Sequence, residues 1–204
     1  MNKLLIATRN IAKSNDYRKI LEELSLSVST LDDLGILEKV EENEKTLLEN
    51  ACKKASFYAR LAKMPAIGDD TGFEIDALGG EPGIHARRWP GYEATDEELR
   101  EMALTKLGDT PYEKRTARLI MYVALADKNG NIIASRTGKI EGIIPKREDC
   151  SHKIDPGYPY RSILFLPQLK KLLIDITKED KEKLQYRLQA MREILPEIKK
   201  VIRN

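Results

Sequence analysis

The first half of the chain alternates short apolar runs with longer amphipathic stretches. Residues 4–7 (Leu-Leu-Ile-Ala) predict a buried strand, and residues 11–24 carry apolar side chains at helical spacing. Residues 26–31 alternate between apolar and polar side chains and predict a second strand. Residues 44–62 predict a strong amphipathic helix that ends before Pro65. Strands and helices that follow one another in this way indicate an α/β protein.

The middle of the chain is less regular. Residues 66–68 and 73–75 predict two short strands on either side of an acidic turn. Residues 79–91 are rich in Gly and Pro and predict a long loop. Thr95 is the expected cap of the helix that follows, which runs to Leu107.

A hairpin is expected next. Segments 117–126 and 132–144 both alternate, and the Asn129-Gly130 pair between them is a hairpin-turn signal. Three further elements complete the chain: a polar loop over 146–160, a short strand over 163–166 and a charged helix from Thr177 towards Ile202. We therefore predict a single α/β domain over residues 1–204, with a long central mixed sheet flanked by helices.

Composition narrows the class of protein. Of the 204 residues 33% are charged, yet the formal net charge is only +2 and no basic stripe with interleaved aromatic residues is present, so nucleic acid is not an expected partner. No apolar run approaches the roughly 20 residues of a membrane span, and no membrane association is expected. Cys52 and Cys150 lie far apart and have no metal-type spacing, which predicts two reduced thiols and a cytoplasmic location.

Two adjacent carboxylates, Asp69 and Asp70, follow directly on an apolar run and precede Thr71 and Gly72. Adjacent carboxylates repel each other unless a cation lies beside them, and oxygen ligands favour Mg²⁺, with Mn²⁺ as the expected substitute. This pair predicts metal-dependent phosphate chemistry. An Asx-type turn with two solvated carboxylates fits the same residues.

A phosphate site is predicted where the first strand meets the first helix. Free N–H groups and the positive end of the helix dipole gather there. Thr8, Asn10 and Lys13 add a hydroxyl, an amide and an ammonium, although the glycine spacing of a P-loop is missing. Simple helix capping with a solvated lysine is the alternative.

Other candidates have ordinary structural explanations as well. The acidic cluster 41–44 precedes a helix and either complements its dipole or supplies a metal ligand. Arg87 and Arg88 follow the glycine loop, where one arginine could bind phosphate in a bidentate way, and a surface loop with an amphipathic anchor is the alternative. Lys181 and Arg187 lie on a charged segment that is equally typical of a solvated helix.

Taken together, the motifs resemble the inosine/xanthosine triphosphate pyrophosphatase family over nearly the whole chain. Residues 8–13 (Thr-Arg-Asn-Ile-Ala-Lys) resemble its opening [ST]-x-N-x-x-K phosphate loop. Residues 46–55 resemble its second block, which Glu42 precedes. Residues 68–73 (Gly-Asp-Asp-Thr-Gly-Phe) and 76–83 (Asp-Ala-Leu-Gly-Gly-Glu-Pro-Gly) resemble its signature A-D-D-S-G-L followed by V-D-A-L-G-G-x-P-G.

The resemblance implies a fold, an activity and a site. Enzymes of this family hydrolyse deaminated purine nucleoside triphosphates to monophosphate and pyrophosphate, work as homodimers, and have two lobes with the active site in a cleft between them. Asp70 is implied as the base that activates water, and Glu42 and Asp70, with Asp69 beside them, as ligands of Mg²⁺. The residues implied in binding the triphosphate are Thr8, Asn10, Lys13, Thr71, Arg88, Lys181 and Arg187.

The chain departs from the family in the segments that read the base. The family's G-G-F-G-Y-D-P falls near 154–160, where this chain has Ile-Asp-Pro-Gly-Tyr-Pro-Tyr. Gly157 and Tyr158 stand for its G-Y, and Tyr186 lies where the family has histidine in S-H-R, so these three residues are assigned to the base pocket. A pocket that loses the polar groups that hydrogen-bond to the base discriminates less well between bases. We therefore expect altered or relaxed base preference in a nucleotide-pool sanitising enzyme.

Two other functions remain open on the sequence. One is a nucleotide-binding or regulatory relative that has lost turnover. The other is a hydrolase of a different phosphorylated small molecule, because a grip on phosphates is generic.

Overall fold

The structure is a computed structural model that describes residues 3–177, 179–180, 184 and 186–203. The chain divides into two compact units. Unit 1 comprises residues 1–70, 121–138 and 186–204, and unit 2 comprises residues 71–120 and 139–185. The prediction of one domain over the whole chain stays a prediction, as does that of a cleft between lobes.

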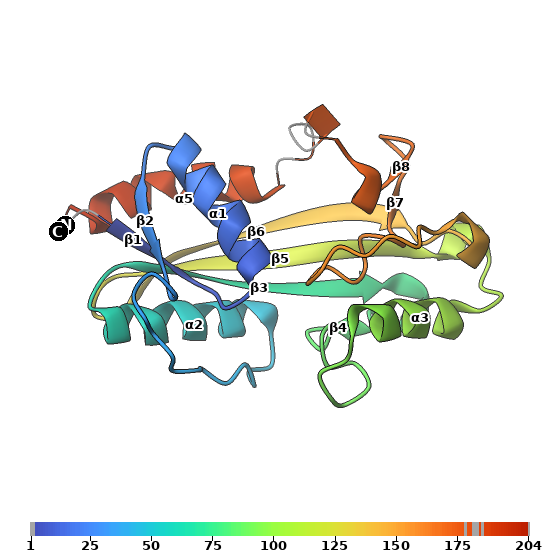
Figure 1. Cartoon of the computed structure of the whole chain (residues 1–204), viewed down its shortest axis with the longest axis horizontal. Helices are drawn as coiled ribbons and strands as arrows, with labels where there is room; N and C mark the ends of the chain where they lie inside the picture. Colours follow the sequence, from blue (N-terminus) through green and yellow to red (C-terminus); the bar gives the residue numbers. More distant parts are fainter. Residues whose placement is uncertain (1–2, 178, 181–183, 185, 204) are drawn as a thin grey trace. The chain divides into compact units, whose positions relative to one another are not determined.

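The strands form a mixed sheet in the order β2-β1-β3-β5-β6-β7-β8, and β4 pairs with β3 (Figure 1). β1 is parallel to both β2 and β3, whereas β7 is antiparallel to β6 and to β8. The strands are β1 (Lys3–Ala7), β2 (Ser27–Thr30), β3 (Ala66–Ile75), β4 (Pro82–Gly83), β5 (Thr116–Ala126), β6 (Ile132–Ile143), β7 (Phe165–Leu166) and β8 (Lys171–Leu172). The predicted mixed sheet with helices around it is confirmed.

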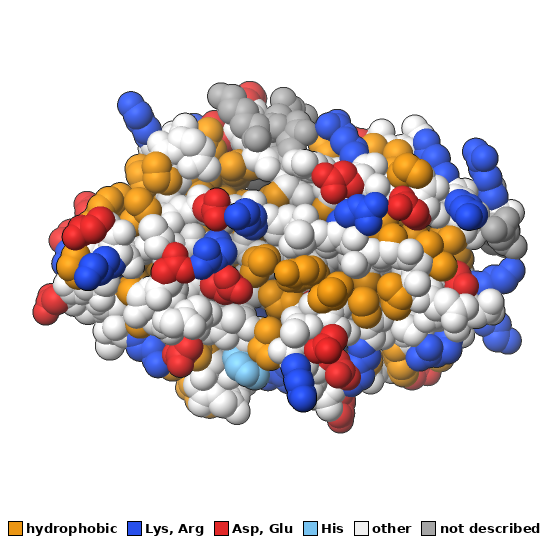
Figure 2. Space-filling model, turned by 180° about the vertical axis from the view of Figure 1, so that it is seen from behind, with side chains coloured by type: hydrophobic (Ala, Val, Ile, Leu, Met, Phe, Trp, Pro, Cys, Tyr) orange, Lys and Arg blue, Asp and Glu red, His pale blue; other side chains and the backbone are white. Residues whose placement is uncertain are grey.

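The α-helices are α1 (Ile11–Glu23), α2 (Leu47–Ala62), α3 (Asp96–Leu107) and α5 (Tyr186–Val201). Short 3₁₀ turns are η1 (Asp76–Leu78), η2 (Tyr112–Lys114), η3 (Arg147–Asp149) and η4 (Leu173–Asp175). None of the helices in the described part of the chain is long and apolar enough to cross a membrane. Acidic and basic side chains are interspersed on the face drawn in Figure 2, in keeping with the small net charge.

Unit 1 has a hydrophobic cluster on each face of its strands. Leu4 and Ile6 of β1 pack with α1 and α5 on one face, and Leu5 and Ala7 pack with α2 on the other. Side chains alternate across a strand, so a strand buried on both faces reads as the continuous apolar run seen at 4–7. This alternation continues into β3 and decides where its carboxylates point.

Unit 2 combines α3 with the remaining strand segments. Thr95 caps α3, as predicted, and forms a capping box with Glu98. Phe73 and Tyr160 stack with ring centroids 4.2 Å apart. The buried Arg115 donates to the carbonyls of Ile144 and Pro145 and so ties the start of β5 to the chain that follows β6.

Three predicted elements need correction. The acidic turn at Asp69-Asp70 is wrong, because β3 runs without interruption from Ala66 to Ile75. α2 begins at Leu47, since Thr46 rather than residue 44 accepts the capping bond from the N–H of Glu49. The strand expected over 163–166 is limited to Phe165–Leu166.

The final helix is confirmed from Tyr186 to Val201. Part of its expected beginning, including Lys181, lies outside the described residues. Thr177 Oγ1 accepts from the N–H of Asp180, which agrees with a helix that begins at Thr177.

Candidate active site

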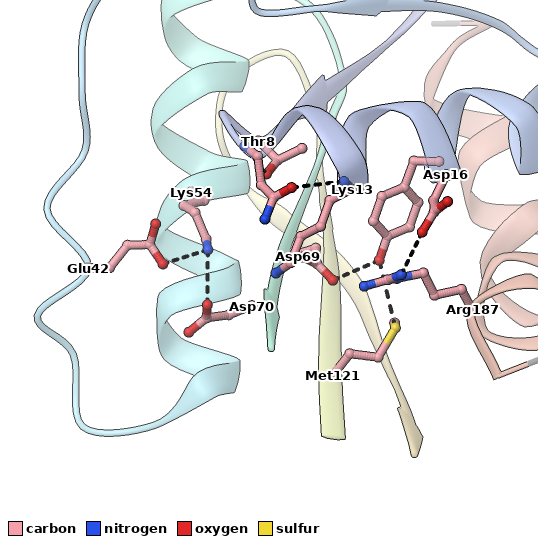
Figure 3. A network of polar contacts seen from close by, with 11 residues as sticks. Thr8, Lys13, Asp16, Glu42, Lys54, Asp69, Asp70, Met121 and Arg187 are labelled. Atoms are coloured by element: carbon pink, nitrogen blue, oxygen red, sulfur yellow. Dashed lines mark hydrogen bonds and ion pairs between the residues drawn. The ribbon is translucent and has the colours of Figure 1, made fainter. Parts of the chain in front are cut away.

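The continuous strand β3 sends Asp69 and Asp70 to opposite faces of the sheet. Ile67 belongs to the cluster with α1 and α5, and Ala66 belongs to the cluster with α2. With a side-chain period of two, Asp69 shares the face of Ile67 and Asp70 shares the face of Ala66. The two carboxylates therefore have separate partners (Figure 3).

Asp69 is buried against α1. Its Oδ1 lies 2.5 Å from the ammonium of Lys13, and its Oδ2 accepts a 2.9 Å hydrogen bond from the hydroxyl of Tyr17. Burial alone raises the pKa of Asp69, but the positive charges of Lys13, Arg187 and Lys54 outweigh it and bring the pKa to about 2. Asp69 is thus ionised at neutral pH, and it holds Lys13 in place.

The loop between β1 and α1 is built as a helix N-terminus. Asn10 is the N-cap, and its Oδ1 accepts a 3.0 Å bond from the backbone N–H of Lys13. Thr8 Oγ1 accepts from the N–H of Asn10 at 3.2 Å. The capping reading of these residues is therefore confirmed. Its companion, a solvated lysine, is wrong, because the side chain of Lys13 is 13% exposed and paired with Asp69.

Asp70 lies on the α2 side, together with Glu42 and Lys54 (Figure 3). Lys54 Nζ is 3.2 Å from Asp70 Oδ1 and 2.7 Å from Glu42 Oε2. Burial raises the pKa of Asp70. The positive charge of Lys54 lowers it, but the effect of burial is larger and the pKa stays raised. Burial lowers the pKa of Lys54, but Asp70 and Glu42 reverse this and leave it raised. The ammonium is the cation that these two carboxylates share.

Gly68 allows α2 to come this close to β3. A Cβ atom at Gly68 would stand 2.5 Å from both the carbonyl oxygen of Ala51 and the backbone nitrogen of Ala55. These atoms flank Lys54 along the helix. A larger residue at Gly68 would push α2, and Lys54 with it, away from Asp70.

Sequence reasoning did not identify Lys54 as a site residue. It is 6% exposed and lies on the buried face of α2 with Asn50, Ala51 and Ala55. A lysine among the apolar positions of an amphipathic helix was the available signal, because such a lysine needs a buried carboxylate partner.

Arg187 and Tyr186 begin α5 in the same unit. Arg187 is 4% exposed, forms a 3.0 Å ion pair with Asp16, and lies over the ring of Tyr17 at 5.7 Å from its centroid. Arg187 thus joins the group around Asp69, whose pKa it helps to lower. The ring of Tyr186 has its centroid 5.3 Å from the Arg187 guanidinium.

Four of the predicted site residues that the structure describes belong to unit 2. Thr71 is half-buried in β3, and Arg88 is exposed on the loop after β4, where the neighbouring Arg87 pairs with Asp96. The N–H of Gly157, at a φ of 85°, donates to Asp96 at 2.8 Å. Tyr158 is 8% exposed, and the Arg161 guanidinium lies 3.5 Å from its ring centroid.

The three carboxylates differ in how well they suit a magnesium ion. No group of three or more His, Cys, Asp or Glu side chains that could hold a metal ion occurs among the described residues. Magnesium is commonly held by one or two carboxylates together with substrate phosphates and water. Glu42 and Asp70 fit that pattern, because both already face one cationic atom. Asp69 fits it less well, because Lys13 and Tyr17 engage its two oxygens.

The fold and this geometry describe an α/β protein in which one unit holds a helix N-terminus and the lysine-paired carboxylates of Asp69, Asp70 and Glu42. The sequence model of the Ham1 family matches residues 4–197. The chain is 34% identical to the dITP/XTP pyrophosphatase of Halalkalibacterium halodurans over 194 residues, which covers 95% of this chain and 97% of that protein. The Escherichia coli protein of the same name is 31% identical over 198 residues, with 96% and 97% covered.

Solved structures agree with the sequence comparison. The Ham1 protein of Staphylococcus aureus superposes with a TM-score of 0.79 at 28% identity, covering 97% of this chain and 98% of that one. A HAM1 protein from Coxiella burnetii gives a TM-score of 0.82 at 25% identity, with 97% and 100% covered. The chain belongs to the Ham1 family.

Proposed function

We propose that this protein hydrolyses nucleoside triphosphates to nucleoside monophosphate and pyrophosphate, as a nucleotide-pool sanitising enzyme. The coarser assignment, a hydrolase of acid anhydride bonds in nucleotides, follows from its membership of the Ham1 family and the names of its relatives. The observation that carries the proposal is the pair formed by Glu42 and Asp70 around Lys54 in the unit that also contains the Thr8–Lys13 loop.

Each part of unit 1 has a chemical task in this reaction. The N–H groups at the start of α1, with Thr8 and Asn10 beside them, bind phosphate oxygens. Lys13, kept in position by Asp69, adds a positive charge to that grip. Asp70 takes the proton of the attacking water, which it faces as a carboxylate on the α2 side of β3.

Magnesium is part of the proposal. Glu42 and Asp70 are the residues that would hold it, and Mn²⁺ is the expected substitute. A bound divalent ion neutralises phosphate charge and orients the triphosphate. Thr71, Arg88 and Arg187 are proposed as further contacts to the substrate. We also propose a homodimer, on the family resemblance alone, and a cytoplasmic location.

Base preference is proposed to be altered or relaxed. The segment near 154–160 departs from the family pattern, and its Tyr158 has one ring face covered by Arg161. Tyr186 is the second aromatic residue proposed to meet the base.

A triphosphate panel tests the proposal. Pyrophosphate and orthophosphate release are measured with Mg²⁺ for inosine, xanthosine, normal purine and modified pyrimidine triphosphates. Release of pyrophosphate from several bases at similar kcat/KM supports the full proposal. A sharp preference for inosine and xanthosine triphosphates keeps the activity but refutes the altered preference. Triphosphate binding without any product favours a regulatory relative.

A further inference from the structure

Arg9 holds the segment that leads to Glu42. Its Nη2 atom donates to the carbonyl oxygen of Ile36 at 3.0 Å and to that of Glu38 at 2.6 Å. The hydroxyl of Tyr58 donates to the same Glu38 carbonyl at 3.0 Å. The carbonyl oxygen of Glu38 thus accepts hydrogen bonds from two side chains, Arg9 and Tyr58, that are far apart in the sequence.

Both donors come from elements that carry the proposed site. Arg9 lies between Thr8 and Asn10 in the phosphate loop, and Tyr58 lies one helical turn after Lys54 on α2. Glu42 follows Glu38 by four residues and reaches Lys54. The position of the Glu42 carboxylate is therefore tied to the phosphate loop and to α2 through Glu38.

At its start the segment is also held by the backbone N–H of Ile36, which donates to the carbonyl oxygen of Leu31 at 3.0 Å. Residues 36–42 contain no helix or strand, and Leu37 is 81% exposed. Ile36 and Val40 contribute the apolar packing, against the cluster on the α2 side. Irregular backbone of this kind opens locally unless hydrogen bonds hold it.

We propose that Arg9 is a positioning residue, which fixes the 36–42 segment so that Glu42 is held ready to bind a divalent cation with Asp70. The proposal rests on the proposed function, because it needs Glu42 to be a metal ligand. An arginine suits the task because the two hydrogens of one Nη atom serve two carbonyls at once. In the absence of Arg9, the segment opens more often and the cation loses part of its preformed site.

The test compares Arg9→Met with Arg18→Met in the full-length protein. Arg18 is the matched control, because its Nη2 reaches from α1 to Asp33 at 2.6 Å, in the turn that precedes residues 36–42. The first readout is hydrogen exchange of the amides of residues 36–42. The second is Mn²⁺ binding to the substrate-free protein, followed by electron paramagnetic resonance. Arg9→Lys, which keeps the charge, is measured in parallel.

We expect Arg9→Met to raise the exchange rates of residues 36–42 and the Kd for Mn²⁺ by about tenfold each, a factor equal to about 1.4 kcal/mol. Arg18→Met should change neither by more than about twofold, and Arg9→Lys should fall between Arg9→Met and the wild type. In kinetics, the Mg²⁺ concentration for half-maximal rate should rise in Arg9→Met, while kcat at saturating Mg²⁺ falls much less.

The outcomes separate the two proposals. Unchanged exchange and Mn²⁺ affinity in Arg9→Met, with a raised KM for triphosphate, would make Arg9 a direct phosphate ligand and overturn the positioning role. Equal effects of Arg9→Met and Arg18→Met would overturn it as well. If the wild type binds Mn²⁺ but turns over no triphosphate, the proposed function fails while the two binding readouts still decide the role of Arg9.

Discussion

Lys54 Nζ lies 3.2 Å from Asp70 Oδ1, at a point where it also contacts Glu42. The ammonium supplies the positive charge that two neighbouring, partly buried carboxylates require. A divalent ion bound by the same carboxylates would do so too, so Lys54 and the metal act on the same charges.

Replacement of Lys54 by Met should make the protein more dependent on the metal. The metal-free variant keeps Glu42 and Asp70 without their shared cation, and we expect it to lose about 2–3 kcal/mol of stability. Added Mg²⁺ should therefore raise its Tm by more than it raises the Tm of the wild type. Thermal unfolding with and without Mg²⁺ measures this. A smaller Mg²⁺ shift in the variant would show that Lys54 helps to build the cation site instead of substituting for the ion.

Asp70→Asn should abolish turnover and leave triphosphate binding measurable. The amide keeps the shape of the side chain but cannot accept a proton from water, and loss of a general base costs about 10²–10⁴ in rate. Single-turnover rates measure the loss of turnover, and calorimetric titration with triphosphate measures the binding that remains. A variant that retains wild-type turnover would remove Asp70 from the role of base.

Tyr17→Phe should lower the free energy of unfolding, because it removes a buried hydrogen bond to Asp69, the partner of Lys13. Its hydroxyl bonds Asp69 at 2.9 Å in a buried setting, and a hydrogen bond to a charged group contributes about 1.5–3 kcal/mol. Tyr58→Phe is the matched control, because its hydroxyl bonds a neutral carbonyl and its loss should cost about 1 kcal/mol. Urea unfolding measures both. Equal losses would mean that the ionised state of Asp69 adds nothing to its bond with Tyr17.

The elements with clear periodicity could be predicted from the sequence. The continuous run 4–7 and the amphipathic pattern of α2 depend on local spacing, and both agree with the structure. The Asp69-Asp70 segment misled the prediction, because Asp and Gly favour turns. Pairing of Gly68 with Ala7 on one side, and of Phe73 and Glu74 with β4 further along, keeps β3 extended instead.

The partners of the charged residues could not be predicted in this way. Asp69 meets Tyr17, which is 52 residues away, and Lys54 meets Glu42 and Asp70, which are 12 and 16 residues away. Such pairs depend on which face of the sheet each strand residue occupies. Once β3 is known to be continuous, the alternation of its side chains assigns Asp69 to α1 and Asp70 to α2.

Gly68→Ala should lower stability by about 3 kcal/mol and disturb the site. The added Cβ would stand 2.5 Å from backbone atoms of α2, which cannot rotate away as a side chain can. Gly79→Ala is the control, because Gly79 has a φ of 64° but open space around it, and only the backbone cost of about 1 kcal/mol applies. Chemical denaturation of both variants checks the difference. A Gly68→Ala loss no larger than that of Gly79→Ala would contradict the close packing of α2 on β3.

The thiol of Cys150 in unit 2 should resist alkylation at pH 8 and weaken the fold at high pH. Cys150 is 7% exposed, and burial raises its pKa to about 11, against the opposing effect of Arg100 and Arg115. The folded state therefore keeps the thiol proton at pH values where the unfolded state, with a pKa near the usual value of about 8.5, has lost it. The unfolded state binds fewer protons in this range, so stability falls as the pH rises from about 8.5 towards 11.

Two measurements check this prediction for Cys150. Iodoacetamide labelling of the folded protein at pH 8 should modify the half-buried Cys52 first. Urea unfolding at pH 8 and pH 10.5 should show a smaller loss in Cys150→Ser than in the wild type, because serine does not titrate in that range. Labelling of Cys150 as fast as Cys52 would contradict the raised pKa and the burial that causes it.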